Sequence, residues 1–174
     1  MIRDIVIYPD SRLRKKSARV ENFDQKLHNL LDDMYETMIA KNGIGLAAVQ
    51  VGVLQRALLI NLPREDELQY KDDLYEIINP RITAQSQHTE PFVEGCLSVP
   101  EVYEEIQRSQ EVTLAYQDRD GCEHSFEAKG MLAIAIQHEI DHLDGKVFVD
   151  QLSYTKRKKF EKEWKKAMRA KKKA

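Results

Sequence analysis

The sequence predicts an α+β fold. Small mixed or antiparallel sheets are expected around a buried central helix, with an N-terminal helix before them and a basic C-terminal helix after them. Apolar residues recur at helical spacing over residues 27–38, an unbroken apolar run spans residues 131–136, and strand-like runs fill the chain between them. With 174 residues, the chain is long enough for one domain with a hydrophobic core.

The first helix is predicted from apolar residues three and four positions apart, and it is expected to end near Asn42 and Gly43, since glycine commonly terminates a helix. Its apolar stripe consists of Leu27, Leu30, Leu31, Met34 and Met38. Strands are predicted at residues 57–62, 75–78 and 112–116. The charged loop at residues 63–73 is expected to be exposed, and residues 118–121 are expected to form a turn.

The last third of the chain contains two histidines and a glutamate at metal-site spacing. His138 and His142 are four residues apart, so one helix face can present both to an ion, while Glu139 reaches the ion's open side as general base. The apolar run at 131–136 predicts that this helix is buried. The five-residue pattern also occurs by chance, with both histidines as ordinary core or surface residues.

A site of this kind needs a third protein ligand. Phe148 occupies the position where a metzincin has its third histidine, and the downstream Glu161 and Glu163 lie in a strongly basic segment that is expected to be solvated. Cys96 is the better candidate, because it follows a glycine in a segment suited to a tightly shaped loop or strand end. The alternative is that Cys96 is a small buried apolar residue, the commoner role of a lone cysteine.

The second cysteine, Cys122, follows the predicted turn at residues 118–121 and has no comparable context, so we interpret it as a bystander. Nothing in the sequence supports a disulfide between the two cysteines. No signal peptide is recognisable, and no apolar run approaches the roughly 18 residues of a membrane span. These features favour a cytoplasmic protein with free thiols that does not enter a membrane.

A further segment, Gly43–Gln50, combines two glycines with small residues, which would let a bound chain lie against exposed backbone. Together with Glu94–Ser98 and Gln137–Gly145, in this order and at these separations, it resembles the peptide deformylases. The resemblance covers nearly the whole chain, beginning with Tyr8–Arg14 and running to Leu152 and Ser153.

Two positions depart from the family pattern. Tyr8 stands where relatives often have histidine, and Tyr103 stands where many bacterial relatives have arginine. Neither belongs to the expected metal ligands or the catalytic glutamate, so the expected chemistry is the same. Tyr103 is expected to alter the rim of the peptide groove.

The resemblance implies removal of the formyl group from the amino-terminal formyl-methionine of newly made bacterial or organellar proteins, with release of formate. Cys96, His138 and His142 would bind one divalent ion, usually Fe(II) in this family, with Zn, Ni or Co as possible substitutes. A water at the fourth position of the ion would be activated for attack, with Glu139 as the general base.

The resemblance also implies how the substrate is held. The Gln50 side chain and the Leu97 backbone N–H would stabilise the negative oxygen that forms during the reaction. The formyl-methionyl peptide would bind as an added strand, with a flexible apolar pocket for the methionine. The implied substrate-binding residues are Ile44, Gly45, Ile134 and Ala135.

Charge is unevenly distributed. Residues 156–174 contain eleven Lys or Arg and two Glu, which gives a formal charge of +9. Because the net charge of the whole chain is −2, residues 1–155 have a formal charge of −11. Phe160, Trp164 and Met168 form a narrow apolar stripe along this segment. We interpret residues 1–155 as the catalytic domain and 156–174 as a basic helical extension of it. The extension either covers the core or contacts ribosomal RNA. No DNA partner is expected.

Two other functions are alternatives to a deformylase. A zinc endopeptidase would cleave internal peptide bonds and would need the third ligand that the downstream sequence lacks. A ribosome-associated binding module with a structural metal would need four protein ligands, commonly with paired short-range cysteines, which this chain does not have.

Overall fold

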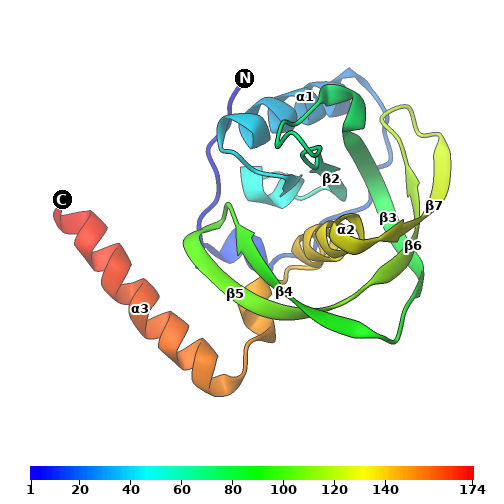
Figure 1. Cartoon of the computed structure of the whole chain (residues 1–174). Helices are drawn as coiled ribbons and strands as arrows, with labels where there is room; N and C mark the ends of the chain where they lie inside the picture. The colour runs from blue at the N-terminus through cyan, green and yellow to red at the C-terminus, as the bar shows by residue number, and fades with distance from the viewer.

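The computed structural model describes residues 1–174 (Figure 1). The helices are α1 (Gln25–Ala40), α2 (Gly130–Leu143) and α3 (Tyr154–Lys173). The strands are β1 (Gly45–Ala47), β2 (Ala57–Ile60), β3 (Tyr75–Gln85), β4 (Thr89–Cys96), β5 (Val99–Ser109), β6 (Glu111–Gln117) and β7 (Glu123–Lys129). Short 3-10 helices lie at Ser11–Arg14, Ala48–Val51, Lys71–Asp73 and Phe148–Gln151. The predicted α+β class is confirmed.

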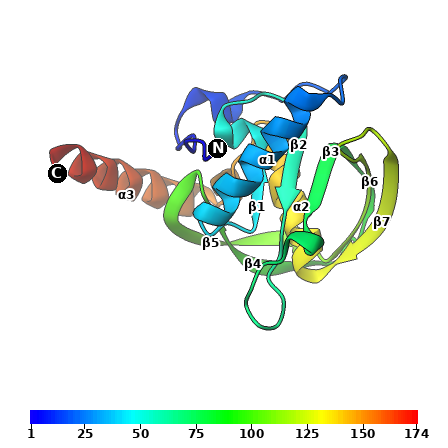
Figure 2. The same ribbon diagram turned by 90° about the horizontal axis from the view of Figure 1, so that it is seen from above.

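The strands form one sheet in the order β1-β2-β3-β6-β7 and a second, two-stranded sheet of β4 and β5 (Figure 2). Every strand pair is antiparallel, and the one parallel contact is an isolated bridge between Ala18 and Gln55. The sheets are therefore antiparallel rather than mixed. β1 pairs only with β2 and β4 only with β5, so each has one free edge.

The three predicted strands correspond to β2, β3 and β6, but β1, β4, β5 and β7 were not predicted. β4, β5 and β7 contain many charged residues, because much of their surface faces solvent, so they lack the apolar runs that mark β2 and β6. The predicted turn joins β6 to β7, and Gly121 has the positive φ of 83° that this turn requires.

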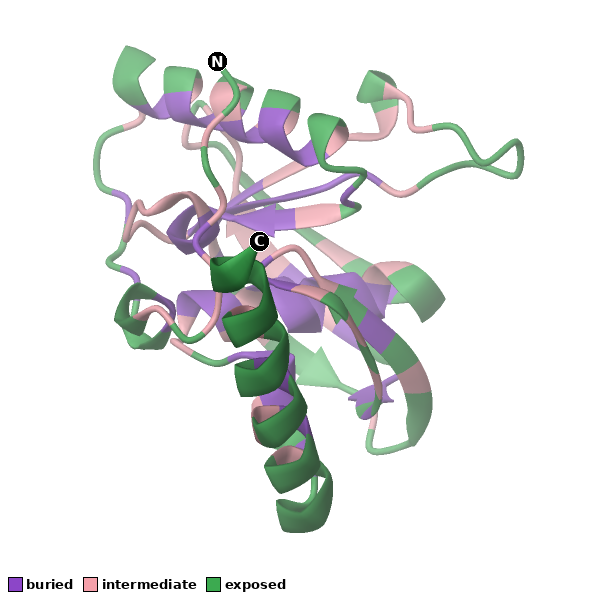
Figure 3. Ribbon diagram, turned by 90° about the vertical axis from the view of Figure 1, so that its left-hand side faces the viewer, coloured by how far each residue is buried: buried purple, intermediate pink, exposed green.

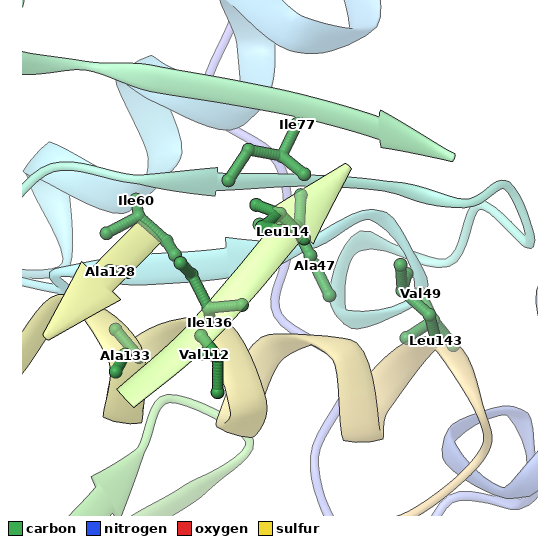
Figure 4. Packing of buried hydrophobic residues seen from close by; sticks show 12 residues of the cluster. Ala47, Val49, Ile60, Ile77, Val112, Leu114, Ala128, Ala133, Ile136 and Leu143 are labelled. Carbon is green, nitrogen blue, oxygen red and sulfur yellow. The ribbon is translucent and has the colours of Figure 1, made fainter. Parts of the chain in front are cut away.

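Strand β2 explains how the core is divided. All four of its residues are buried, and alternate side chains point to opposite faces of the sheet. Leu58 and Ile60 pack on α2 together with residues such as Ile136 and Leu114 (Figure 4). Ala57 and Leu59 pack on the other face, against α1. A strand covered on both faces has no polar alternation, which accounts for the continuous apolar run in its sequence.

Helix α1 covers the outer face of the sheet with the predicted stripe, in which Leu31, Met34 and Met38 are fully buried. Asp24 caps its first turn by accepting a hydrogen bond from the Leu27 N–H. The helix ends at Ala40, and the residue with the left-handed conformation after it is Asn42, with φ 57°, rather than Gly43.

Helix α2 contacts β1, β2, β6 and β7 of the large sheet and β5 of the small one, so it lies between the two sheets (Figure 1). Residues 133–139 are all buried. The expectation that the apolar run is buried throughout is wrong at its start: Met131 is 44% exposed, because the first turn reaches the molecular surface.

Helix α3 packs on the body through one narrow stripe and is otherwise exposed (Figure 3). Phe160 and Trp164 are buried against the Tyr8 ring, with ring centroids 5.5 and 5.9 Å away, and the indole Nε1 donates to the Tyr8 carbonyl oxygen at 3.2 Å. The helix therefore covers part of the core, one of the two predicted roles. None of the helices is both long and apolar enough to span a membrane.

Candidate metal centre and active site

Cys96, at the end of β4, meets both histidines of α2. The ligand atoms of Cys96, His138 and His142 all lie within 4.8 Å of one another, and the Cys96 Sγ is 3.3 Å from the His142 Nε2. The structure thus brings together the three residues predicted as ligands, although Cys96 and His142 lie 46 residues apart in the chain. Cys122 is exposed before β7 and lies outside this cluster.

The chemistry of these three donors fits a divalent transition metal. One thiolate and two imidazoles form the type of set that binds zinc or iron and leaves a coordination position for water. The buried Glu139 Oε2 has no hydrogen-bond partner within the protein, as expected for a carboxylate that faces a site for water. Phe148, at the place of a metzincin's third histidine, is buried with its ring centroid 6.1 Å from that of His138.

A buried ionic network fixes the orientation of His138. Its Nδ1 lies 2.7 Å from the Glu94 Oε1. Arg108 donates to both oxygens of Glu94, at 2.6 and 2.9 Å, and to Asp141 at 2.7 Å. Burial by itself would raise the pKa of Glu94, but the hydrogen bonds from Arg108 and His138 hold that pKa below its ordinary value. The carboxylate is therefore charged and leaves the His138 Nε2 to face the site.

The other ligand ring has a different environment. Burial lowers the pKa of His142 well below its ordinary value, and the charge of His138 lowers it further, which favours the neutral imidazole that a ligand must be. Burial also acts to lower the pKa of His138, but hydrogen bonds to Cys96 and Glu94 raise it well above the ordinary value. The anions that favour a proton on His138 would equally favour a bound cation.

Glu139 is buried beside the ligands, with its Oε1 3.9 Å from the His138 Nε2. Burial raises its pKa to about 7, a value suited to exchanging protons near neutrality. Its carboxylate lies against the backbone of Gly45: a Cβ added there would be 2.6 Å from the Glu139 Oε1. Position 45 therefore requires glycine, because the Glu139 carboxylate occupies the space that a Cβ atom would need.

Gln50 is held in one orientation inside the protein. Its Oε1 accepts from the Ala47 N–H at 2.9 Å, so its Nε2 must face the other way. The Nε2 donates to the Ser98 Oγ at 3.1 Å and points to the Cys96 Sγ at 3.4 Å. This amide donor is therefore directed toward the cysteine of the metal cluster.

A pocket of about 530 Å³ opens onto this cluster. The predicted site residues that line it are Ile44, Gly45, Gln50, Cys96, Leu97, Ile134, Ala135, His138 and Glu139, while His142 lies deeper and is 1% exposed. Its two sides are the segment around β1 and the end of β4, which are edge strands of different sheets. A peptide in extended form can pair with such edges.

The mouth of the pocket carries much of the exposed apolar surface. Eight large apolar side chains in the chain are exposed, and four of them line this pocket: Ile44, Val93, Tyr103 and Met131. The Tyr103 ring lies over Gly95, where an added Cβ would be 2.6 Å from its Cε1. Tyr103 thus forms part of the rim of this pocket.

Two functional residues were not recognised from the sequence. Glu94 was noticed only as part of its motif, and Arg108 was not singled out at all. Their partners lie 14 to 44 residues away, so no local spacing indicates the network. No other signal distinguished them, because β4 and β5 contain several further charged residues.

Comparisons with known proteins agree in a single family. The family model described as polypeptide deformylase matches residues 2–158. A peptide deformylase of Helicobacter hepaticus is 59% identical over 163 residues, covering 93% of this chain and 90% of that protein. One of Campylobacter jejuni is 53% identical over 95% of each chain.

Solved structures give the same result. A peptide deformylase from Legionella pneumophila superposes with a TM-score of 0.89 at 40% identity, covering 100% of this chain and 99% of that one. One from Ehrlichia chaffeensis, in complex with actinonin, has a TM-score of 0.87 at 46% identity, covering 95% and 97%.

Proposed function

Because the chain belongs to the polypeptide deformylase family, we propose that its pocket carries out the hydrolysis of N-formyl-methionyl peptides to formate and a free amino terminus. Cys96, His138 and His142 hold the metal ion in this proposal. The observation that carries it is their convergence, together with Glu139, at the base of a pocket bounded by two free strand edges.

A divalent ion held by the three ligands would polarise the formyl group and lower the pKa of a water toward neutrality. Glu139 accepts the proton of the attacking water and then delivers it to the leaving amine, a role that its pKa near 7 suits. Gln50, through its Nε2, and Leu97, through its backbone N–H, donate to the oxygen of the formyl group as negative charge develops. A donor placed in advance is worth about 3 kcal/mol of the barrier.

The substrate is bound mainly through its backbone and its first side chain. The edge of β1 at Gly45 pairs with the extended peptide, and Ile44, Ile134 and Ala135 surround the methionine side chain. Because the remaining contacts are to backbone, the enzyme tolerates many sequences after methionine.

We propose Fe(II) as the ion in the cell, as the family resemblance implies, with Zn, Ni or Co as substitutes that the same donors accept. A thiolate next to Fe(II) makes the site sensitive to oxygen. Protein purified without air should contain iron and lose activity on exposure to air, whereas zinc-loaded protein should not show that loss.

The two other functions are less well supported. An endopeptidase would need a further ligand after His142, and Phe148 occupies that position in the core. A structural metal would need four protein ligands, whereas the cluster contains three and a catalytic carboxylate.

We also propose that formyl-methionyl nascent chains are met at the ribosome, in the cytoplasm, with α3 as the basic contact and residues 1–155 as the catalytic domain. Lys165, Lys166 and Lys172 are exposed on α3, away from the stripe that packs on Tyr8. Their replacement by glutamine should weaken ribosome co-sedimentation at low salt, while glutamine at Lys26, Lys71 and Lys129 should not. Equal binding by both variants would contradict the proposed contact.

The direct test of the reaction is formate release from a formyl-Met peptide. Wild-type protein purified without air should release formate, and Glu139→Ala should bind the metal but release formate at least about 100-fold more slowly. No release by the metal-loaded wild type would refute the proposed function.

A further inference from the structure

A second hollow lies away from the metal pocket and shares no residue with it. It has a volume of about 790 Å³, larger than the metal pocket, and is bounded by residues 16–19, the middle of β3, and the ends of β6 and β7 that meet at their turn. Figure 2 shows β3, β6 and β7 side by side on this part of the sheet. We call this hollow the cationic cleft, because Lys16, Arg19, Arg56 and Arg81 line it.

Two arginines of this cleft differ from all the others in the catalytic domain. Nine arginines occur in residues 1–155, and seven of them form ion pairs with carboxylates. The two that form none, Arg19 and Arg81, both line the cationic cleft. In a domain with a formal charge of −11, carboxylates are plentiful, so two exposed guanidinium groups without one in the same hollow indicate a site for an external anion.

The other charged groups around the cleft leave its positive character in place. Arg56 is fixed by Asp144 at 3.0 Å and by the Leu143 carbonyl oxygen at 3.2 Å. His124 contacts Asp118 at 2.7 Å. Glu123 is the one acidic residue of the lining, against the four cations.

Two uncharged features make the cleft more than a cluster of surface cations. Ser17 lines the cleft and is only 3% exposed, and the Ser17 hydroxyl has no hydrogen-bond partner within the chain. Tyr116 and His124 are stacked on one wall, with ring centroids 5.3 Å apart and an interplanar angle of 23°. A buried hydroxyl usually has a partner, and stacked rings beside cations suit a nucleobase joined to a phosphate.

We propose that the cationic cleft binds the phosphate group of a ribonucleotide, either free or within an RNA strand. Arg19 and Arg81 bind the phosphate oxygens, since the guanidinium fork matches two of them at once, and Lys16 adds a point charge. The rings of Tyr116 and His124 accept the base. Arg56 joins the cleft to the end of α2 through Asp144, but the site is distinct from the catalytic one.

Calorimetric titration at low salt tests the proposal with three probes: inorganic phosphate, adenosine monophosphate and a short single-stranded RNA. The test variant is Arg19→Gln/Arg81→Gln, in which both replaced side chains are exposed, so the fold should be unchanged. The control, Arg64→Gln/Lys71→Gln, removes the same charge from exposed positions outside the cleft.

We expect the wild type and the control to bind adenosine monophosphate or the RNA equally and more tightly than inorganic phosphate, and the test variant to bind that probe about tenfold more weakly or worse. Binding of inorganic phosphate alone would contradict a nucleotide site. Adenosine monophosphate bound as tightly as RNA identifies a free nucleotide as the ligand, whereas binding of RNA alone identifies a strand. Failure of the wild type to bind any probe, or equal weakening in both variants, would overturn the proposal.

Discussion

The last two helices of the chain, α2 and α3, differ in how they are held in the fold: α2 is buried, and α3 is mostly exposed. α2 is surrounded by both sheets, and its buried residues include two of the proposed metal ligands, His138 and His142, and the proposed base, Glu139. α3 is longer, strongly basic and exposed, and only Phe160 and Trp164 are buried. α2, the helix with the fewest charged residues, thus contains the proposed site residues. α3, the helix with the most charged residues, is attached to the body of the protein by two aromatic side chains. Changes near α2 should therefore affect catalysis, and changes on α3 should affect stability or partners.

The largest loss of bound metal and of activity is expected for a change at Cys96, where β4 meets α2. Cys96→Ala removes one of three ligands, so the protein should lose most of its bound metal and its activity. Metal content per chain after anaerobic purification is the measurement. Cys122→Ala, which changes an exposed thiol outside the site, is the control and should retain the metal. Equal metal contents in both variants would overturn the ligand assignment.

A smaller but still large effect is expected where β1 touches α2. In Gly45→Ala the new methyl group would displace the Glu139 carboxylate, and a misplacement of this kind costs about 100-fold in rate. In the control, Gly43→Ala, the methyl group meets the tip of the Leu97 side chain, which can move, so the loss should be smaller. Steady-state kinetics at equal metal content distinguish the two, and a larger loss in Gly43→Ala would contradict this account.

The ionic network behind His138 should set metal affinity. Glu94→Gln replaces the carboxylate that Arg108 and His138 share, so metal affinity should fall roughly 10- to 100-fold. Competition with a chelator measures the change. Glu105→Gln, an exposed change on β5, should leave the affinity as it is. If Glu94→Gln binds metal like the wild type, the network does not support the site.

On α3 the expected effect is on stability alone. Trp164→Ala removes a buried ring and its hydrogen bond to Tyr8, which should cost roughly 3 kcal/mol and lower the thermal unfolding midpoint. Met168→Ala, at a half-buried position of the same stripe, should cost less. Formate release at low temperature should be unchanged in both. A tenfold loss of activity in Trp164→Ala would break the separation between the two helices.

The sequence predicted those parts whose signals are local. Helices α1 and α3 follow from apolar spacing, α2 from an unbroken apolar run before two histidines four residues apart, and β2 from a run that is apolar because both of its faces are covered. The ligand and base positions came from short motifs and a family resemblance. β4 and β5 escaped prediction because their exposed residues are charged, and Arg108 did because its partners, Glu94 and Asp141, are near it only in the folded chain. The cationic cleft was unpredictable for the same reason, since Arg19 and Arg81 lie in unrelated segments.

In the proposed mechanism, Cys96, the α2 residues and Gln50 form one site that removes a formyl group and leaves peptide bonds intact. Mass spectrometry of a formyl-Met peptide, incubated with metal-loaded wild-type protein, is the decisive measurement. We expect that the peptide loses its formyl group and is otherwise unchanged, and that Glu139→Ala leaves it formylated. Cleavage within the peptide, or an unchanged peptide with the wild type, would contradict it.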